Sequence, residues 1–366
     1  MYLTAVNKRI TTETMDLYST ELRNTPYWQT LEPVIQSGAM ESAIRGEYRY
    51  PYRINIYPGT SCMFSCLFCG RNYDAVVKGS QNIFSQIIQQ DDGKDLDRIN
   101  ISGGLEPLTS PYINEITKDL HDKGYRSRMI TNGFMLNDKI LNKNPYVNSL
   151  HHIRVSLYGL DHEEYVATTK HQKGWQVVKD NLTSYNKRSD RTKLFLNYVL
   201  IPENFEKLGR IIDYIRDIGG IDNLSLREDF TFQYEIQERN KVRDALLEFD
   251  ESVKSMGVTV DYGYALQDAM NGNDNKLMQV THKELTAKQS PQIKICIDPN
   301  GHIYSHMEAG FVDRPGAARH SLGNVRGSSV EQELKKQVEV EPQDGDTQYM
   351  DAYNHLMAKF IYDQTT

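Results

Sequence analysis

This sequence of 366 residues has no long apolar run, no surplus of basic residues and only four cysteines. No apolar stretch approaches the ~20 residues that span a bilayer, so a membrane protein is excluded. The start, MYLTAVNKRITTETMD, has no long apolar core followed by a small-residue cleavage site, so we expect a cytoplasmic protein. There are 42 Lys and Arg residues, scattered along the chain, against 49 Asp and Glu, which argues against a nucleic-acid partner.

The scarcity of cysteine is informative because of where the four cysteines lie. Cys62, Cys66 and Cys69 fall within eight residues, whereas Cys296 stands alone. Four cysteines in this arrangement do not make a disulfide framework. In a cytosolic chain, such clustering indicates metal ligation.

From residue 52 onward, short β-branched or aromatic runs alternate with longer amphipathic stretches, the pattern of repeated β-α units. Strands are predicted at 52–57, 98–103, 127–132, 152–158, 193–201 and 223–228, and helices at 80–90, 111–124, 138–143, 175–187, 205–219 and 241–257. We therefore predict an α/β fold, a partial TIM-like (β/α)6 barrel whose strands end at a shared rim. Residues 1–51 form an N-terminal helical lead-in, 52–265 the barrel and 266–366 a small α+β C-terminal cap, with a polar linker at 271–289.

The cysteine loop, YPGTSCMFSCLFCGRNY, follows the first predicted strand and so lies at the rim. Three residues separate Cys62 from Cys66, and two separate Cys66 from Cys69. Three thiolates at this spacing can bind three irons of a cubane cluster and leave the fourth iron open to another ligand. The alternative is a structural zinc site in a non-catalytic binding protein, completed by Cys296 or a histidine.

The spacing C-x3-C-x2-C, with the aromatic Phe68 just before the last cysteine, resembles the signature of the radical S-adenosylmethionine (SAM) superfamily. The resemblance implies one 4Fe-4S cluster, with SAM bound at its open iron. One electron, from a donor such as flavodoxin or ferredoxin, then cleaves SAM to a 5'-deoxyadenosyl radical.

Two further parts of the predicted rim fit this resemblance. The segment ISGGLEPLTSP follows the second predicted strand and is similar to the family's GGEP-like segment, which binds the SAM amino group; it differs by the insertion of Leu105. Polar residues near the ends of later strands contact SAM in the family. The resemblance thus implies cofactor-binding roles for Phe68, Gly103, Gly104, Glu106, Pro107, Ser156 and Asn197, and Arg227 at the end of the sixth predicted strand is a further cofactor-binding candidate.

Ordinary structural roles are open for several of these residues. A Gly-Gly pair after a strand also makes a tight turn, and Ser156 and Asn197 can satisfy neighbouring backbone groups instead. Arg227 belongs to a charged triplet, 227–229, that recognises a polar substrate or SAM, or is a solvated strand end.

The C-terminal segment QIKICIDPNGHIYSH alternates, with Ile293, Ile295 and Ile297 on one face and Cys296 on the other, and PNG predicts a hairpin turn. Together with SLGNV at 321–325 it resembles the SPASM/twitch extensions of radical SAM enzymes. With one cysteine instead of several, the extension is predicted to be degenerate and to close the barrel. Cys296 is a candidate hydrogen donor to a substrate radical, or a packing residue.

The predicted function is hydrogen abstraction from a small polar natural-product intermediate, such as a sugar, cyclitol or nucleoside. Epimerisation, dehydrogenation, elimination and decarboxylation all branch from the same substrate radical, and we favour an epimerase or oxidoreductase. The alternative within the same superfamily is modification of a ribosomal peptide.

Overall fold

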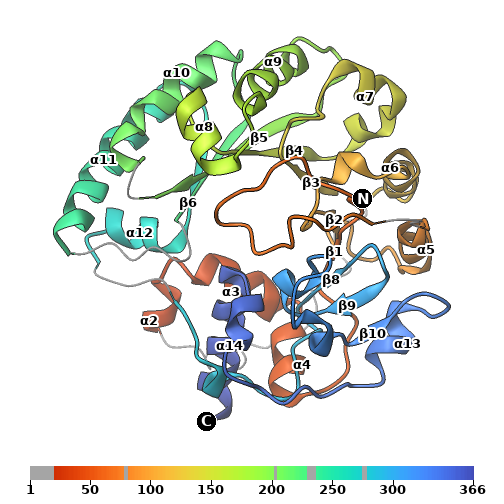
Figure 1. The fold of residues 1–366 in the computed structure, drawn as a ribbon. Coiled ribbons are helices and arrows are strands. Elements are labelled where there is room, and N and C mark those ends of the chain that lie inside the picture. The colour runs from red at the N-terminus through yellow and green to blue at the C-terminus, as the bar shows by residue number, and fades with distance from the viewer. Residues whose placement is uncertain (1–19, 78–80, 202–203, 229–235, 274–277) are drawn as a thin grey trace, which may run out of the picture.

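The computed structural model describes residues 20–77, 81–201, 204–228, 236–273 and 278–366. Its strands form one curved sheet in the order β10-β9-β8-β1-β2-β3-β4-β5-β6-β7 (Figure 1). From β8 to β7 all neighbours are parallel, and β8, β9 and β10 pair antiparallel. The strands are β1 (Arg53–Ile56), β2 (Ile99–Ile101), β3 (Arg128–Thr131), β4 (His152–Leu157), β5 (Lys193–Leu200), β6 (Asn223–Glu228), β7 (Thr259–Tyr262), β8 (Lys294–Ile297), β9 (His302–Tyr304) and β10 (Gly323–Asn324).

Helices cover the outer side of this sheet, as expected of a partial barrel (Figure 1). Side-chain caps start several of them: Asn82, Asn137 and Asp161 each accept a hydrogen bond from a backbone N–H of the first turn. The layer consists of α5 (Ile83–Gln90), α6 (Ile113–Asp122), α7 (Asp138–Lys143), α8 (His162–Thr169), α9 (Gly174–Asn186), α10 (Gly209–Asp217), α11 (Ile236–Lys254) and α12 (Tyr264–Met270).

The predicted fold class is confirmed, and all six predicted strands are present. The predicted helices correspond to α5, α6, α7, α9, α10 and α11, and residue 80 lies outside the described residues. Helices α8 and α12 and strand β7 were not predicted from the sequence. Short 3-10 helices complete the chain: η1 (Pro107–Thr109), η2 (Pro145–Ser149), η3 (Phe205–Lys207), η4 (His282–Glu284), η5 (Met307–Gly310), η6 (Ala317–His320) and η7 (Asp346–Tyr349).

Strand alternation separates the core from the barrel interior. In β5, the even-numbered residues from Leu194 to Leu200 are buried, whereas Phe195, Asn197 and Val199 are partly exposed on the opposite face. The buried face packs against the outer helices in one large apolar cluster. The other face lines the inside of the barrel, where a ligand can reach it.

A second apolar cluster joins the two ends of the described chain. Leu31 and Val34 of α3 (Trp28–Gln36) pack with Leu356 and Phe360 of α14 (Ala352–Thr365). Figure 1 shows α3 and α14 together below the sheet. The remaining helices are α2 (Thr20–Arg23), α4 (Ala39–Arg45) and α13 (Val330–Leu334). The domain boundaries at 51 and 265 stay predictions.

The C-terminal hairpin extends the barrel sheet, because β8 pairs with β1 in parallel, with Arg53 opposite Lys294 and Asn55 opposite Cys296. The predicted hairpin is confirmed by the antiparallel pairing of β8 with β9. Cys296 lies on the face of β8 opposite Ile295 and Ile297, as alternation predicts, but the expectation that this is not an apolar side is wrong, because all three residues are 0% exposed and Cys296 packs in an apolar cluster of its own. Residues further along the C-terminal region cover the face of β8 that carries Cys296, a face that the alternating pattern alone would leave exposed.

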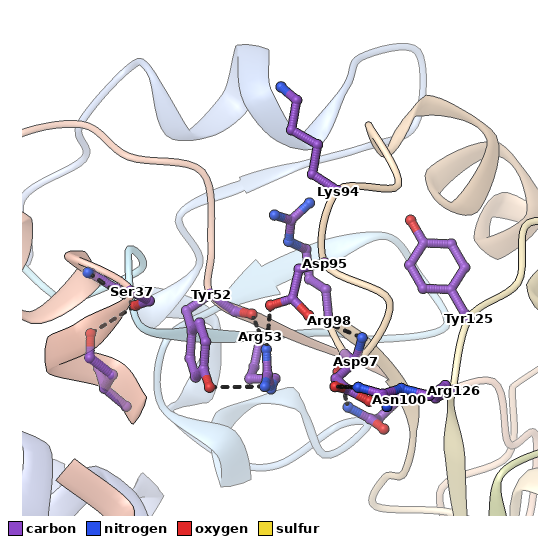
Figure 2. A network of polar contacts seen from close by, with 12 residues as sticks. Ser37, Tyr52, Arg53, Lys94, Asp95, Asp97, Arg98, Asn100, Tyr125 and Arg126 are labelled. Carbon is purple, nitrogen blue, oxygen red and sulfur yellow. Dashed lines mark hydrogen bonds and ion pairs between the residues drawn. The ribbon is translucent and has the colours of Figure 1, made fainter. Parts of the chain in front are cut away.

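Charged contacts tie together the loops in which the first strands begin (Figure 2). Arg53 donates hydrogen bonds to Asp95 at 2.7 Å and to the Tyr52 hydroxyl at 2.8 Å. Arg126 forms an ion pair with Asp97, which joins the segments before β3 and β2. Among the described residues, no helix is both long and apolar enough to traverse a bilayer.

Candidate active site

Cys62, Cys66 and Cys69 lie in the loop between β1 and α5 and line one cavity of about 230 Å³. The segments that follow β2, β3 and β4 form its other walls, at the rim where the parallel strands end. The cysteine pocket, as we call this cavity, therefore has the predicted position. It brings together these predicted site residues: Cys62, Cys66, Cys69, Phe68, Gly103, Gly104, Glu106, Pro107 and Ser156.

Arg71 and Tyr73 hold the cysteine loop by its backbone. The Arg71 side chain is 6% exposed, and its guanidinium donates to the carbonyls of Phe64, Asn72 and Tyr73. The Tyr73 hydroxyl donates to the carbonyls of Cys66 and Cys69. Hydrogen bonds from a charged group are stronger than neutral ones, so Arg71 fixes the turn from which the thiols project.

The three thiols share an environment that disfavours the unpaired negative charge of a thiolate. Burial, followed by the charges of Cys69 and Cys62, raises the pKa of Cys66 to about 12. Burial also raises the pKa of Cys62 and of Cys69, and Arg71 acts in the opposite direction on all three. These thiols become thiolates on binding a metal centre, which supplies the compensating positive charge.

The arrangement of the thiols suits a cluster better than a single ion. In the described parts of the chain, no three or more His, Cys, Asp or Glu side chains are grouped so that one metal ion can bind them all. A zinc site needs such convergence, whereas in a cubane each thiolate binds a different iron. Three cysteines that line one cavity thus fit a 4Fe-4S cluster, with one thiolate for each of three irons.

The Gly-Gly segment lets the chain pass close to its neighbours. Gly103 has φ +136°, and a Cβ there would lie 2.9 Å from the Tyr57 side chain. At Gly104 a Cβ would lie 2.6 Å from the Phe311 ring. These contacts explain why both positions are glycine, while direct binding of SAM by them stays a prediction.

Glu106 is fixed by hydrogen bonds at the floor of the pocket. It is 2% exposed and accepts from Thr131 at 2.6 Å, from the Asn132 N–H at 2.8 Å and from the Leu108 N–H at 3.1 Å. Burial raises its pKa, and these hydrogen bonds oppose that rise. The carboxylate therefore positions the ends of β2 and β3, and a contact of Glu106 with SAM stays a prediction.

The sequence analysis missed several residues of the pocket. Thr131 ends β3 and Asn132 follows it, and the Asn132 amide lies 3.6 Å from the Cys62 sulfur. The signal was available, because polar residues at the end of a barrel strand point to the rim. Glu308 and Phe311, from the C-terminal region, also line the pocket and had no such signal.

Aromatic packing places Phe68 at the pocket wall, where its ring stacks on Tyr158 with centroids 6.0 Å apart. Ser156 lies two residues before Tyr158 and also lines the pocket. Asn197 pairs with Ser156 across β4 and β5 but does not line the pocket, and Arg227 lines a different cavity. Asp229 lies outside the described residues.

Cys296 lines neither cavity. Its sulfur is enclosed by an apolar cluster that includes Tyr57, Tyr304 and Met307, and it lies 3.5 Å from the Met307 carbonyl oxygen. Hydrogen donation by Cys296 stays a prediction, and this enclosure favours its packing role.

Comparison with known proteins agrees with the geometry of the pocket. Residues 56–215 match the radical SAM superfamily. A relative from Streptomyces venezuelae, dTDP-4-amino-4,6-dideoxy-D-glucose ammonia-lyase, is 32% identical over 358 residues, covering 90% of this chain and 74% of the relative. The chain belongs to the radical SAM superfamily. A probable GTP 3',8-cyclase from Metallosphaera sedula is 28% identical over 193 residues, 49% of this radical SAM chain and 59% of the cyclase.

Solved radical SAM structures share the fold. Streptococcus suis SuiB bound to SAM has a TM-score of 0.53 at 16% identity, covering 84% of this chain and 69% of SuiB. The enzyme anSMEcpe with bound SAM has a TM-score of 0.53 at 13% identity, covering 79% of this chain and 82% of that chain. At these identities the likeness shows a common architecture.

As a radical SAM enzyme, the protein uses a 4Fe-4S cluster and SAM and needs an electron donor. Cys62, Cys66 and Cys69 would hold the cluster. When bound, the pair supplies a deoxyadenosyl radical. The degenerate SPASM/twitch character of the C-terminal region stays a prediction.

Proposed function

We propose that this radical SAM enzyme removes ammonia from a nucleoside-diphosphate-linked amino sugar. The observation that carries the proposal is the 32% identity to dTDP-4-amino-4,6-dideoxy-D-glucose ammonia-lyase, which extends over 90% of this chain. A sugar is one of the substrate classes that the sequence predicted. Elimination replaces the epimerase or oxidoreductase that the sequence favoured.

The reaction is an elimination from neighbouring carbons. A hydrogen atom is abstracted from a carbon that bears a hydroxyl, and the C–N bond of the adjacent carbon breaks to release ammonia. Conversion of the amino alcohol into a ketone and ammonia leaves the net oxidation state of the sugar unchanged. An external reductant, flavodoxin or ferredoxin in this proposal, supplies two electrons per turnover: one cleaves SAM, and the other, with a proton, reduces the α-keto radical that remains after ammonia leaves, so each turnover converts one SAM into 5'-deoxyadenosine and methionine.

The residues of the cysteine pocket position SAM and the sugar and exclude water from them. Phe68 and Tyr158 form an apolar wall beside the thiols, and Phe311 closes the side next to Gly104. Enclosure of this kind protects a carbon radical from side reactions. Ser156 and Asn132 offer polar groups at the same rim for hydrogen bonds to SAM or to a sugar hydroxyl.

The test is anaerobic turnover of dTDP-4-amino-4,6-dideoxy-D-glucose by protein reconstituted with iron and sulfide, in the presence of SAM and a reductant. We expect ammonia and a dTDP-linked keto sugar, formed together with 5'-deoxyadenosine. Deuterium on the abstracted position should appear in 5'-deoxyadenosine.

The matched control is dTDP-6-deoxy-D-glucose, which carries a hydroxyl in place of the amine and cannot release ammonia. Cleavage of SAM without ammonia from the amino sugar would contradict the proposal. Turnover of a peptide instead would favour the peptide-modifying alternative.

A further inference from the structure

A second and larger cavity, of about 880 Å³, lies inside the barrel and carries four cations. Arg128 of β3, Arg154 of β4, Arg227 of β6 and Lys294 of β8 all line it. Its remaining walls come from β7, α12, α3 and the start of α14, elements that can be followed in Figure 1. We call it the arginine cavity.

The three arginines have no described carboxylate within ion-pair distance. Lys294 pairs with Asp351 at 3.3 Å, but no ion pair among the described residues involves Arg128, Arg154 or Arg227. The Nε of Arg154 is buried and has no hydrogen-bond partner in the described chain. The three arginines are half-buried, and the nearby Asp261 offsets only part of the unfavourable effects on Arg154, so a bound anion would stabilise these cations.

The guanidinium groups also repel one another. Burial, followed by the charges of Arg128 and Arg227, lowers the pKa of Arg154 to about 10. Burial, then Arg53 and Arg227, lowers the pKa of Arg128. Perturbed groups gathered in a cavity are typical of functional sites, and a bound anion would relieve this repulsion.

The arginine cavity and the cysteine pocket lie along the same inner face of the barrel. Arg128 precedes Ile130 by two residues in β3, and Arg154 precedes Ser156 by two in β4, so each pair points to one side of the sheet. Ile130 and Ser156 line the cysteine pocket. Two residues of strand span about 7 Å, a separation that a sugar ring can bridge.

We propose that Arg128, Arg154 and Arg227 bind the diphosphate of a nucleoside-diphosphate sugar and so direct its sugar ring toward the cysteine pocket. This inference rests on the proposed function, and it adds the site that recognises the activated sugar. A guanidinium forms paired hydrogen bonds with phosphate oxygens, and three of them match a group that carries more than one negative charge.

Carboxylates at the edge of the arginine cavity make the site selective. Glu228 and Asp261 line it, and one carboxylate oxygen of Glu228 is buried without a hydrogen-bond partner in the described residues. Hydroxyl or ammonium groups of a sugar nucleotide suit these oxygens, whereas an anion away from the arginines would be repelled. Inorganic pyrophosphate, which has no such groups, should bind less well.

The experiment measures binding of dTDP to the reconstituted holoenzyme with SAM present, by anaerobic isothermal titration calorimetry at fixed ionic strength. We expect Arg128→Gln, Arg154→Gln and Arg227→Gln each to weaken dTDP binding at least tenfold, and dTMP to bind more weakly than dTDP. Arg154→Lys keeps the charge but loses the paired geometry, so it should fall between Arg154→Gln and the wild type.

The matched control is Arg216→Gln, because Arg216 is exposed on α10 and pairs only with Asp213 in the described chain, at 3.3 Å. It should bind dTDP like the wild type. Iron content and the thermal unfolding midpoint show whether each variant is folded. If Arg154→Gln does not fold, Arg227→Gln at the end of β6 carries the test.

Equal dTDP affinity of the wild type and all folded arginine variants would overturn the inference and leave the proposed function intact if the amino sugar still releases ammonia. Pyrophosphate binding without dTDP binding would also overturn it. If dTDP binds in an arginine-dependent way but no ammonia is released, the proposed function fails while the diphosphate site stands.

Discussion

The cysteine pocket and the arginine cavity share one barrel but are built in different ways. One short loop supplies all three thiols, whereas the arginines come from three strands separated along the chain. The loop is held by its own neighbours Arg71 and Tyr73, while the arginines depend on the register of the whole sheet. The thiols that serve the chemistry common to the superfamily thus come from one short motif. The arginines proposed to recognise the substrate are brought together only by the tertiary structure.

Replacing a thiol should have the largest effect and act on the cysteine pocket alone. We expect Cys66→Ala to abolish the cluster and all formation of 5'-deoxyadenosine, because two thiolates leave a third iron without its ligand. Iron analysis and anaerobic visible absorption measure the outcome. Cys296→Ala is the control and should retain its iron, since Cys296 lies outside the pocket. A Cys66→Ala protein with full iron would contradict the ligand assignment.

Loss of the charged hydrogen bonds to the loop should be next in size. Arg71→Gln removes the charged donor from three backbone carbonyls, of which that of Phe64 is buried, and each such bond contributes up to about 1.5–3 kcal/mol. We expect several-fold less iron after reconstitution and at least tenfold less 5'-deoxyadenosine. Arg126→Gln, at an exposed ion pair with Asp97, should behave like the wild type. Unchanged iron in Arg71→Gln would show that the loop holds its shape without this side chain.

The smallest effect concerns pH and His152, which lies two residues before Arg154 in β4. Burial, followed by the charges of Arg154, Arg128, His151 and Lys193, lowers the pKa of His152 to about 3. Below pH ~6.5 the unfolded chain binds a proton that the folded protein does not, so stability falls as pH drops. Between pH 7.5 and 5.5 the loss is about 1 kcal/mol for this group.

His152→Phe should remove that part of the pH dependence, measured by urea unfolding at the two pH values. The exposed His162, changed to Gln, is the control and should keep the wild-type difference. An unchanged difference in His152→Phe would mean that neither burial nor the neighbouring cations lower the pKa of this ring in the folded protein.

The sequence predicted the local parts of the structure well. Six strands, the hairpin and the cysteine pocket followed from alternation, turn residues and the spacing of Cys62, Cys66 and Cys69. These features depend on residues close together in the chain, so periodicity and spacing reveal them.

The parts that were missed depend on distant pairing. Nothing near Cys296 in the sequence indicates that the segment around Met307 buries its thiol; alternation placed Cys296 opposite Ile295 and Ile297 without showing that this second face is covered as well. In the sequence, Arg128 and Arg154 look like ordinary strand residues. Only the parallel pairing of β3 with β4 brings them close together. The short strand β7 was not predicted because its residues are exposed or half-buried, so no run of buried apolar residues marks it in the sequence.

The parallel pairing of β1 with β8 affects how the protein is made. The strand that leads into the cysteine loop obtains one of its two neighbours only when the last quarter of the chain has been synthesised. Until then β1 is an unpaired edge, prone to pairing with other chains. Contacts between segments so distant along the chain slow folding, so β1 should be among the last strands of the barrel to gain both neighbours.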